Sequence, residues 1–293
     1  MPLDTRYAGL AGEPVSEIVE PRWAMNFAAG IGDLNPALYA TDKGALPVHP
    51  LYLGYAEWEA TKLLMREVEL SDAERMRGVA AGLHQTVHRP IETGMRLTTV
   101  AAISGIQRHR AGALMHKVIE TRCEGELVCA TVFRSILRDV EVTGDDRPPS
   151  EALPGNGAVA PLPRDGAPAF SETIALPANL CHVYSECARA YNAIHTDIAV
   201  AGKAGLPGLI LHGSATMSLA VSALVNRIAG GDVRRVRSLS GDYRAMVLVP
   251  GSIRVDIMAP VATGDGEAVA FSVVTDGDKP AIANGMVLLR PAA

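Results

Sequence analysis

The sequence has few aromatic residues, little excess of charge of either sign, and no long uninterrupted apolar segment. Phe, Trp and Tyr make up 4% of its 293 residues, although hydrophobic residues of all kinds make up 48% and charged residues 20%. These proportions allow a sizeable core and argue against a disordered chain. The most apolar stretch, residues 209–228, is interrupted by His, Ser, Asn and Arg. We therefore expect a buried helix there and not a membrane-spanning one.

Other absences narrow the range of partners. Lys and Arg total 27 against 32 Asp and Glu, a net charge of −5, so the chain lacks the basic surface of a nucleic-acid-binding protein. The first residues, MPLDTRYAGLAGEP, show no basic segment followed by an apolar one, as a secretory signal would. We expect a soluble cytoplasmic protein that has neither nucleic acid nor a membrane as its partner.

The four cysteines predict no metal site. Cys123, Cys129, Cys181 and Cys187 include no CxxC pair and have no histidine pair at zinc spacing. We expect them to be reduced, buried thiols.

A proline- and glycine-rich stretch divides the chain. Residues 144–168 hold too much proline and glycine for a helix or a central strand, so we expect a linker between an N-terminal domain, 1–143, and a C-terminal domain, 169–293. The two halves look alike. Asn35 and His49 in the first match Asn192 and His212 in the second, 157 and 163 residues later.

Each half also predicts the same order of elements: a short strand, a helix, an irregular loop, a longer helix and four antiparallel strands. Segments rich in β-branched residues, separated by turn signals, follow the longer helix in both halves. The expected strands are 83–91, 96–107, 113–121 and 126–137 in the first half, and 238–248, 252–261, 267–275 and 281–289 in the second. The fold class is therefore α+β, in which a helix packs on one face of an antiparallel sheet.

Three strings of the second half carry a family resemblance. Residues 192–197 (NAIHTD), 201–208 (AGKAGLPG) and 210–216 (ILHGSAT) resemble the MaoC-like (R)-specific enoyl-CoA hydratase family. The first half shows the resemblance weakly, through residues 32–36 (GDLNP). The family implies a hotdog fold, and its larger members fuse two hotdogs in one chain. The resemblance thus implies a double hotdog, two fused units with a long helix on an antiparallel sheet in each.

Hydration of a 2-enoyl thioester needs a base that accepts a proton from water, and donors that hold the thioester oxygen as it becomes enolate-like. An imidazole suits the first task, and backbone N–H groups at a helix N-terminus suit the second. The resemblance assigns them to His195 and to the N–H of Gly213. The alternatives are a surface or capping role for His195 and simple close packing at Gly213.

Two neighbouring residues have less definite roles. His212 either contacts the substrate or makes a structural hydrogen bond between loop and helix. Asn192 either positions the loop through its own backbone or contacts the water.

The sequence departs from the family at one position. The family places an Asp five residues before its catalytic His, but this chain has Ala190 there. Glu186, one helical turn earlier, is the first candidate for the missing carboxylate, and Asp33 of the first half is the second. In the third alternative His195 works with Gly213 and Asn192 alone, on changed chemistry.

The resemblance therefore predicts a hydratase or dehydratase that acts on an acyl thioester, with its working site in the second half and a degenerate site in the first. The alternatives are another lyase or isomerase reaction, thioester binding alone, or an inert partner of a catalytic homologue. We expect no metal or redox cofactor, with coenzyme A or an acyl-carrier protein as part of the substrate, and either a monomer or a homodimer.

Overall fold

A computed structural model describes residues 1–150 and 166–292 of the chain. Within this part, the chain forms two compact units: residues 1–17, 56–89 and 96–150 form unit 1, and residues 18–55, 90–95 and 166–292 form unit 2. The predicted boundaries at 143 and 169 thus separate the sequence repeats but not the compact units, because residues 18–55 pack with elements of the second half.

The predicted linker is only partly visible, since its residues 151–165 lie outside the described part of the chain. At its start, Arg147 and Ile106 exchange two backbone hydrogen bonds of 2.8 Å. This end of the linker is therefore fixed to unit 1.

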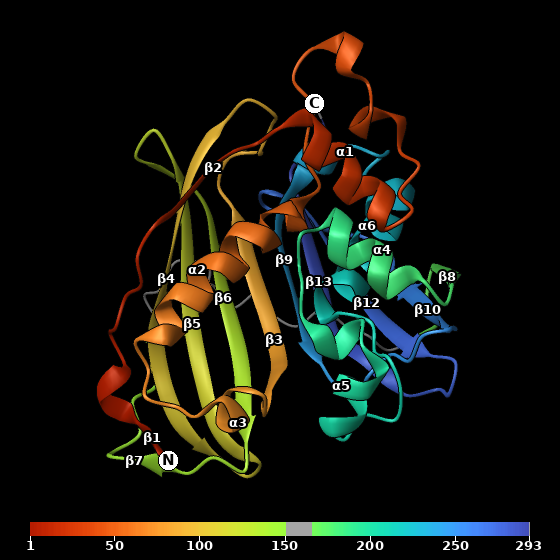
Figure 1. Ribbon diagram of the computed structural model, residues 1–293. Coiled ribbons are helices and arrows are strands. Elements are labelled where there is room, and N and C mark those ends of the chain that lie inside the picture. Colours follow the sequence, from red (N-terminus) through yellow and green to blue (C-terminus); the bar gives the residue numbers. More distant parts are fainter. Residues whose placement is uncertain (151–165, 293) are drawn as a thin grey trace. The chain divides into compact units, whose positions relative to one another are not determined.

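Unit 1 is an antiparallel sheet with a helix across it (Figure 1). The strands lie in the order β2 (Val15–Ile18), β4 (Arg96–His109), β5 (Gly112–Cys123), β6 (Glu126–Arg138) and β3 (Gly78–Val87). The other elements are α2 (Gly54–Arg66), α3 (Asp72–Arg75) and the short parallel pair β1 (Leu3–Asp4) and β7 (Val142–Thr143). Ala60 and Leu64 of α2 pack against Ile103, Met115 and Ile119 of the sheet. Burial alternates along β5, as one core-facing side of a strand requires.

The strands of unit 2 are antiparallel as well. They lie in the order β9 (Val236–Tyr243), β13 (Pro280–Leu289), β12 (Gly266–Thr275), β10 (Gly251–Ile257) and β8 (Phe170–Leu176), with β11 (Val261–Thr263) paired to β12. The helices are α1 (Pro21–Gly30), α4 (Leu180–Cys187), α5 (Ile198–Lys203) and α6 (Gly213–Ile228). The central helix α6 contacts β9, β10, β12 and β13 and is buried on all sides from Ala215 to Val225, as expected for a helix that is apolar all round.

Helices α1 and α4 of unit 2 pack closely at Gly30. A Cβ added there would lie only 2.5 Å from Cys187 Cβ, so a larger residue would not fit without a shift. Short 3-10 turns complete the described elements: Thr5–Tyr7, Pro36–Leu38, Thr41–Lys43, Pro50–Leu53, Ala193–His195 and Val233–Arg235.

The predicted order of elements is confirmed, with several differences at strand ends. The expected strand 238–248 ends at Tyr243, and the strand expected from residue 83 begins at Gly78. The expected strand 252–261 is broken into β10 and β11, and Pro260, which has no N–H to donate, lies in the break. The expected strand 83–91 ends at Val87, before Pro90. In the described ranges, we find no helix with both the length and the apolar character needed to cross a membrane.

Candidate active site

The loop after α4 is held by its own polar groups. The helix ends at Cys187, and Arg189 then takes a left-handed conformation with φ of 54°. Asn192 Oδ1 accepts from the N–H of Ile194 at 3.3 Å, which caps the 3-10 turn that ends at His195. Asp197 caps α5 through a 2.8 Å bond from the N–H of Ala199. These caps are what Asn and Asp favour at turn and helix starts, and they place His195 in a defined position.

The tautomer of His195 follows from the hydrogen bond that its ring makes. Its Nδ1 lies 2.8 Å from the carbonyl oxygen of Ile210. Because a carbonyl oxygen only accepts, Nδ1 carries the proton and donates it, and Nε2 keeps a free lone pair. Burial lowers the pKa of His195, while the Ile210 carbonyl opposes that shift. The side chain is therefore a neutral base near pH 7, with its basic nitrogen free.

His212 lies against His195. The two rings stack with centroids 3.6 Å apart and an angle of 26° between their planes. His212 Nε2 lies 2.9 Å from the carbonyl oxygen of Ala190, and the Tyr184 ring packs beside it at 5.0 Å. Burial, helped by the neighbouring His195, lowers the pKa of His212 to about 3. This residue joins the loop to the start of α6 and also contacts the imidazole of the proposed base.

Gly213 begins α6 directly after His212. His212 makes no side-chain capping bond to the helix, and the first N–H groups of a helix have no partner within it. Gly213 and its neighbours thus present N–H groups at the positive end of a helix, where a developing negative charge is stabilised. A Cβ on Gly213 would lie 3.2 Å from Cε1 of Tyr243. Close packing against Tyr243 is therefore a reason for glycine at this position, in addition to the proposed role of its N–H.

The geometry does not support Glu186 as the missing carboxylate. The prediction required α4 to continue to Ala190, but the helix ends at Cys187 and the left-handed Arg189 turns the chain away. Glu186 is exposed and lines a depression of about 450 Å³ with His182 and Tyr191. Among the described residues, no hydrogen bond or ion pair joins it to His195.

Asp33 is engaged elsewhere in unit 2. Its carboxylate accepts from Ser222 Oγ at 2.7 Å, from Asn226 Nδ2 at 3.2 Å and from the N–H of Asn35 at 3.0 Å. Ser222 lies about 13 Å along α6 from Gly213 at the usual rise of ~1.5 Å per residue. The carboxylate thus fixes the first-half loop to the C-terminal part of α6, and no hydrogen bond or ion pair between Asp33 and His195 is present among the described residues.

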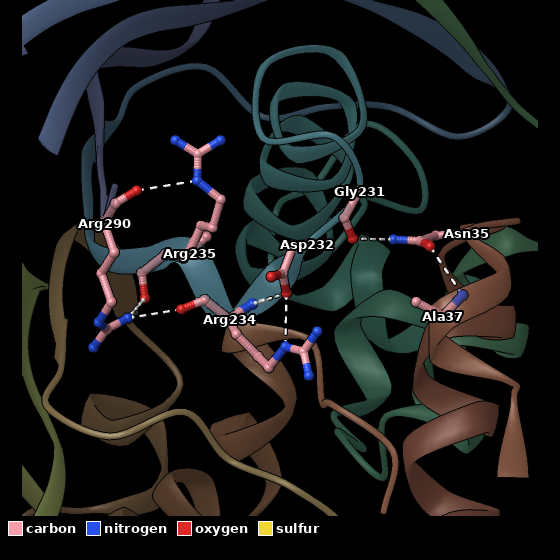
Figure 2. A network of polar contacts seen from close by, with 8 residues as sticks. Asn35, Ala37, Gly231, Asp232, Arg234, Arg235 and Arg290 are labelled. Carbon is pink, nitrogen blue, oxygen red and sulfur yellow. Dashed lines mark hydrogen bonds and ion pairs between the residues drawn. The ribbon is translucent and has the colours of Figure 1, made fainter. Parts of the chain in front are cut away.

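Figure 2 shows the same loop reaching the end of α6. Asn35 Nδ2 donates to the carbonyl oxygen of Gly231 at 2.6 Å, and Asn35 Oδ1 accepts from the N–H of Ala37. Close by, Asp232 pairs with Arg234 at 2.8 Å. Asn35 therefore has a structural role at the far end of the helix from Gly213.

Sequence reasoning missed the groups that orient the two histidines. The carbonyl oxygens of Ile210 and Ala190 accept from their rings, and no sequence signal marks a backbone carbonyl. Arg189, also missed, lies with its guanidinium 3.6 Å from the centre of the Tyr55 ring and 3.2 Å from Tyr52 Oη. Aromatic residues of the first half thereby hold the loop that ends at His195.

All four cysteines are free thiols, and three of them are buried. Within residues 1–150 and 166–292, no three side chains of His, Cys, Asp or Glu gather as the ligands of a metal ion would.

Comparison with known families decides what this arrangement belongs to. Residues 167–276 match the family model described as "MaoC like domain". The domain contains the loop with Asn192 and His195 as well as the start of α6 at Gly213, so the resemblance read from the sequence is confirmed.

Known proteins support the domain and the fold. The peroxisomal enoyl-CoA hydratase 2 of Arabidopsis thaliana is 26% identical over 179 residues, which are 59% of this chain and 56% of that protein. The chain thus spans about half the length of this relative. Among solved structures, a MaoC-like dehydratase from Phytophthora capsici superposes with a TM-score of 0.80 at 18% identity, over 99% of this chain and 98% of that one.

A second solved structure names the architecture. A Mycobacterium tuberculosis protein described as a double hotdog superposes with a TM-score of 0.64 at 14% identity, over 97% of this chain and 96% of that one. The predicted double hotdog is confirmed, with the MaoC-like domain in its second half.

Proposed function

We propose that this protein adds water to a 2-enoyl thioester, or eliminates it from a 3-hydroxyacyl thioester. The observation that carries the proposal is the free Nε2 of His195, fixed by the Nδ1–Ile210 bond of 2.8 Å, in the same loop-and-helix arrangement as the N–H groups that begin α6. The MaoC-like domain and its Arabidopsis relative, a hydratase by name, support it.

The chemistry needs only proton transfers. His195 Nε2 accepts a proton from water while the water oxygen forms a bond to the β-carbon of the substrate. The electrons of the carbon–carbon double bond move toward the thioester oxygen, which the N–H of Gly213 stabilises. Protonated His195 then returns its proton to the α-carbon, and the base is regenerated. Elimination of water follows the same steps in reverse.

This reaction leaves no task for a metal or redox cofactor, because no electron is transferred between molecules and the thioester already activates the alkene. We propose coenzyme A or an acyl-carrier protein as the carrier, attached to the substrate. We further propose that Asn192, whose Oδ1 caps the turn, uses its free Nδ2 to position the substrate or the water. We also propose that the protein is cytoplasmic and that it is a monomer or a homodimer. Cell fractionation tests the compartment, and sedimentation tests the oligomeric state.

Ala190, in place of the Asp that the family resemblance predicts, is compatible with two alternative functions. No carboxylate forms a hydrogen bond or ion pair with His195 among the described residues, and burial, opposed by the Ile210 carbonyl, lowers the pKa of that histidine. A protein that binds a thioester without transforming it, or one with other lyase or isomerase chemistry, would also tolerate this site.

Turnover of a panel of trans-2-enoyl-CoA substrates, followed by loss of the enoyl absorbance, separates these functions. We expect hydration by the wild type and a loss of kcat of about 10²–10⁴-fold in His195→Gln, as for removal of a general base. The matched control is His182→Gln, since His182 also contacts a loop carbonyl, that of Thr196 at 2.9 Å, but is exposed. Binding of the same thioesters without turnover would support the alternative instead.

A further inference from the structure

The position of His212 determines its tautomer. Its Nε2 lies 2.9 Å from the carbonyl oxygen of Ala190, which only accepts, so Nε2 carries the proton and donates it. Ser185 Oγ lies 3.4 Å from the same nitrogen. This hydroxyl already donates its own proton to the carbonyl of Cys181 at 2.7 Å, so it too can only accept from His212. The Nδ1 atom therefore holds a free lone pair.

That lone pair is buried and unpaired. His212 is 5% exposed, and among the described residues its Nδ1 has no hydrogen-bond partner. An acceptor left unpaired in a protein interior costs about 1–3 kcal/mol, and native proteins pair nearly all such atoms. A water molecule or a ligand hydroxyl could donate a hydrogen bond to this nitrogen.

The unpaired atom belongs to the ring stacked on the proposed base. The centroids of His212 and His195 are 3.6 Å apart. A water that hydrogen bonds to two atoms at the usual ~2.8 Å can link atoms up to about 5.6 Å apart, and nitrogen atoms of two stacked imidazoles fall within such reach. The separation of the two rings is thus within the span of one bridging water.

We propose that Nδ1 of His212 holds the water that attacks the substrate, as a second acceptor beside Nε2 of His195. This inference rests on the proposed hydration. The water gives one proton to His195 Nε2 as its oxygen bonds to the β-carbon. Its other hydrogen stays on the oxygen, hydrogen-bonded to His212 Nδ1, and becomes the hydroxyl hydrogen of the product. His195 then returns its proton to the α-carbon, so the atoms balance without any further reactant.

The electrostatics suit a residue that accepts a hydrogen bond and takes no proton. With its pKa lowered to about 3 by burial and by His195, His212 is neutral near pH 7. The two stacked rings thus have different roles. His195 accepts the proton, and His212 orients the water so that its oxygen lone pair points at the β-carbon.

Two substitutions of His212 separate its two nitrogen atoms. In His212→Asn, the amide oxygen takes the place of Nδ1 and keeps an acceptor there, while the contact with Ala190 is lost. In His212→Gln, the longer side chain keeps a donor for the Ala190 carbonyl and loses the acceptor at the Nδ1 position. His182→Gln is again the control.

We expect kcat for enoyl-CoA hydration to fall about 10²-fold in His212→Gln with KM within a few-fold, as when a reacting group loses its orientation. His212→Asn should lose less than ~10-fold. The proposal is overturned if His212→Gln keeps the wild-type kcat, or if His212→Asn loses as much as His212→Gln. If the wild type hydrates no enoyl thioester at all, the proposed function fails and this inference fails with it.

A measurement on the wild type covers the case in which a variant does not fold. With ¹⁵N-labelled histidine, the Nδ1 resonance of His212 should report an unprotonated nitrogen. It should shift on saturation with a 3-hydroxyacyl-CoA, which carries the hydroxyl donor, but not with the saturated acyl-CoA of the same length. Equal responses to the two ligands, or a protonated Nδ1, would contradict the proposal even if turnover is normal.

Discussion

The two loops that the sequence repeat brings into unit 2 each match one residue of the Asp and His pair that the family resemblance predicts. The second-half loop has His195, the proposed base, with Ala190 five residues before it. The first-half loop has the carboxylate, Asp33, with Leu38 five residues after it. Both loops use an Asn to cap a 3-10 turn, with Asn35 Oδ1 3.1 Å from the N–H of Ala37 in the first. Their backbone designs are thus alike, although their chemistry is not.

The histidines before the longer helices differ in the same way. His49 Nδ1 accepts from the N–H of Leu51 at 3.1 Å and so caps its own 3-10 turn, which starts with Pro50 and therefore offers one N–H fewer. The His212 side chain makes no such capping bond and is followed by Gly213, whose N–H has no partner within the helix. Burial lowers the pKa of His49 to about 4. Both rings keep one buried nitrogen without a hydrogen-bond partner among the described residues, Nε2 in His49 and Nδ1 in His212. The two histidines thus differ in which nitrogen is bonded and in the residue that follows them.

Asp33→Ala tests the structural side of this comparison and should have the largest effect. The change leaves Ser222, Asn226 and the N–H of Asn35 without their acceptor, at a buried site that is 5% exposed. We expect the free energy of unfolding to fall by about 3 kcal/mol, measured by urea denaturation, with kcat within about 2-fold of wild type in the folded protein. A loss of kcat of about 10²-fold with unchanged stability would instead make Asp33 the missing carboxylate.

Gly213→Ala and Gly54→Ala compare the two helix starts. A Cβ at Gly213 meets the Tyr243 ring at 3.2 Å, whereas at Gly54, the first residue of α2, nothing lies within 4 Å. We expect Gly213→Ala to lower kcat about 10–10²-fold, since a displaced N–H no longer points at the thioester oxygen. Gly54→Ala should leave kcat unchanged and slightly raise the melting temperature, because Ala favours helix. Equal kinetics for the two variants would argue against a chemical role for Gly213.

The pH profile tests which histidine is the base. Only a neutral imidazole accepts a proton, so kcat/KM should rise with pH through the pKa of His195 in the free protein. Burial lowers that pKa from 6.5, so the midpoint should lie below pH 6.5 and the rate should be level between pH 7 and 8. His49 and His212, with pKa values of about 4 and about 3, stay neutral throughout. A midpoint above 7 would show that another group is titrating.

Much of this fold was predictable, because alternation and turn signals depend on local sequence. Strands β4, β5, β6, β12 and β13 lie close to their expected bounds. The membership of residues 18–55 in unit 2 was not predictable, since it depends on packing between segments far apart in the chain.

At the site, His195 and Gly213 could be assigned because the strings around them resemble a known family. The oxygen atoms that orient the rings could not, since every residue has a carbonyl. Ala190 illustrates the difference. From the sequence, its side chain indicates that the expected carboxylate is missing. Only the structure shows that its carbonyl oxygen accepts a hydrogen bond from His212.

Glu186 is the residue for which helical spacing gave the wrong expectation, and its substitution should have the smallest effect. Spacing of four residues brings side chains together only while the helix continues, and here α4 ends at Cys187 with a left-handed Arg189 after it. We expect Glu186→Gln to keep kcat within about 2-fold of wild type and the midpoint of the pH profile unchanged, since a solvated carboxylate has little influence on a buried ring. A lower kcat together with an acidic limb moved to lower pH would show that Glu186 reaches His195 during catalysis. For that outcome, the residues between Cys187 and Ala190 would have to form a further turn of α4. In this structure they do not continue the helix.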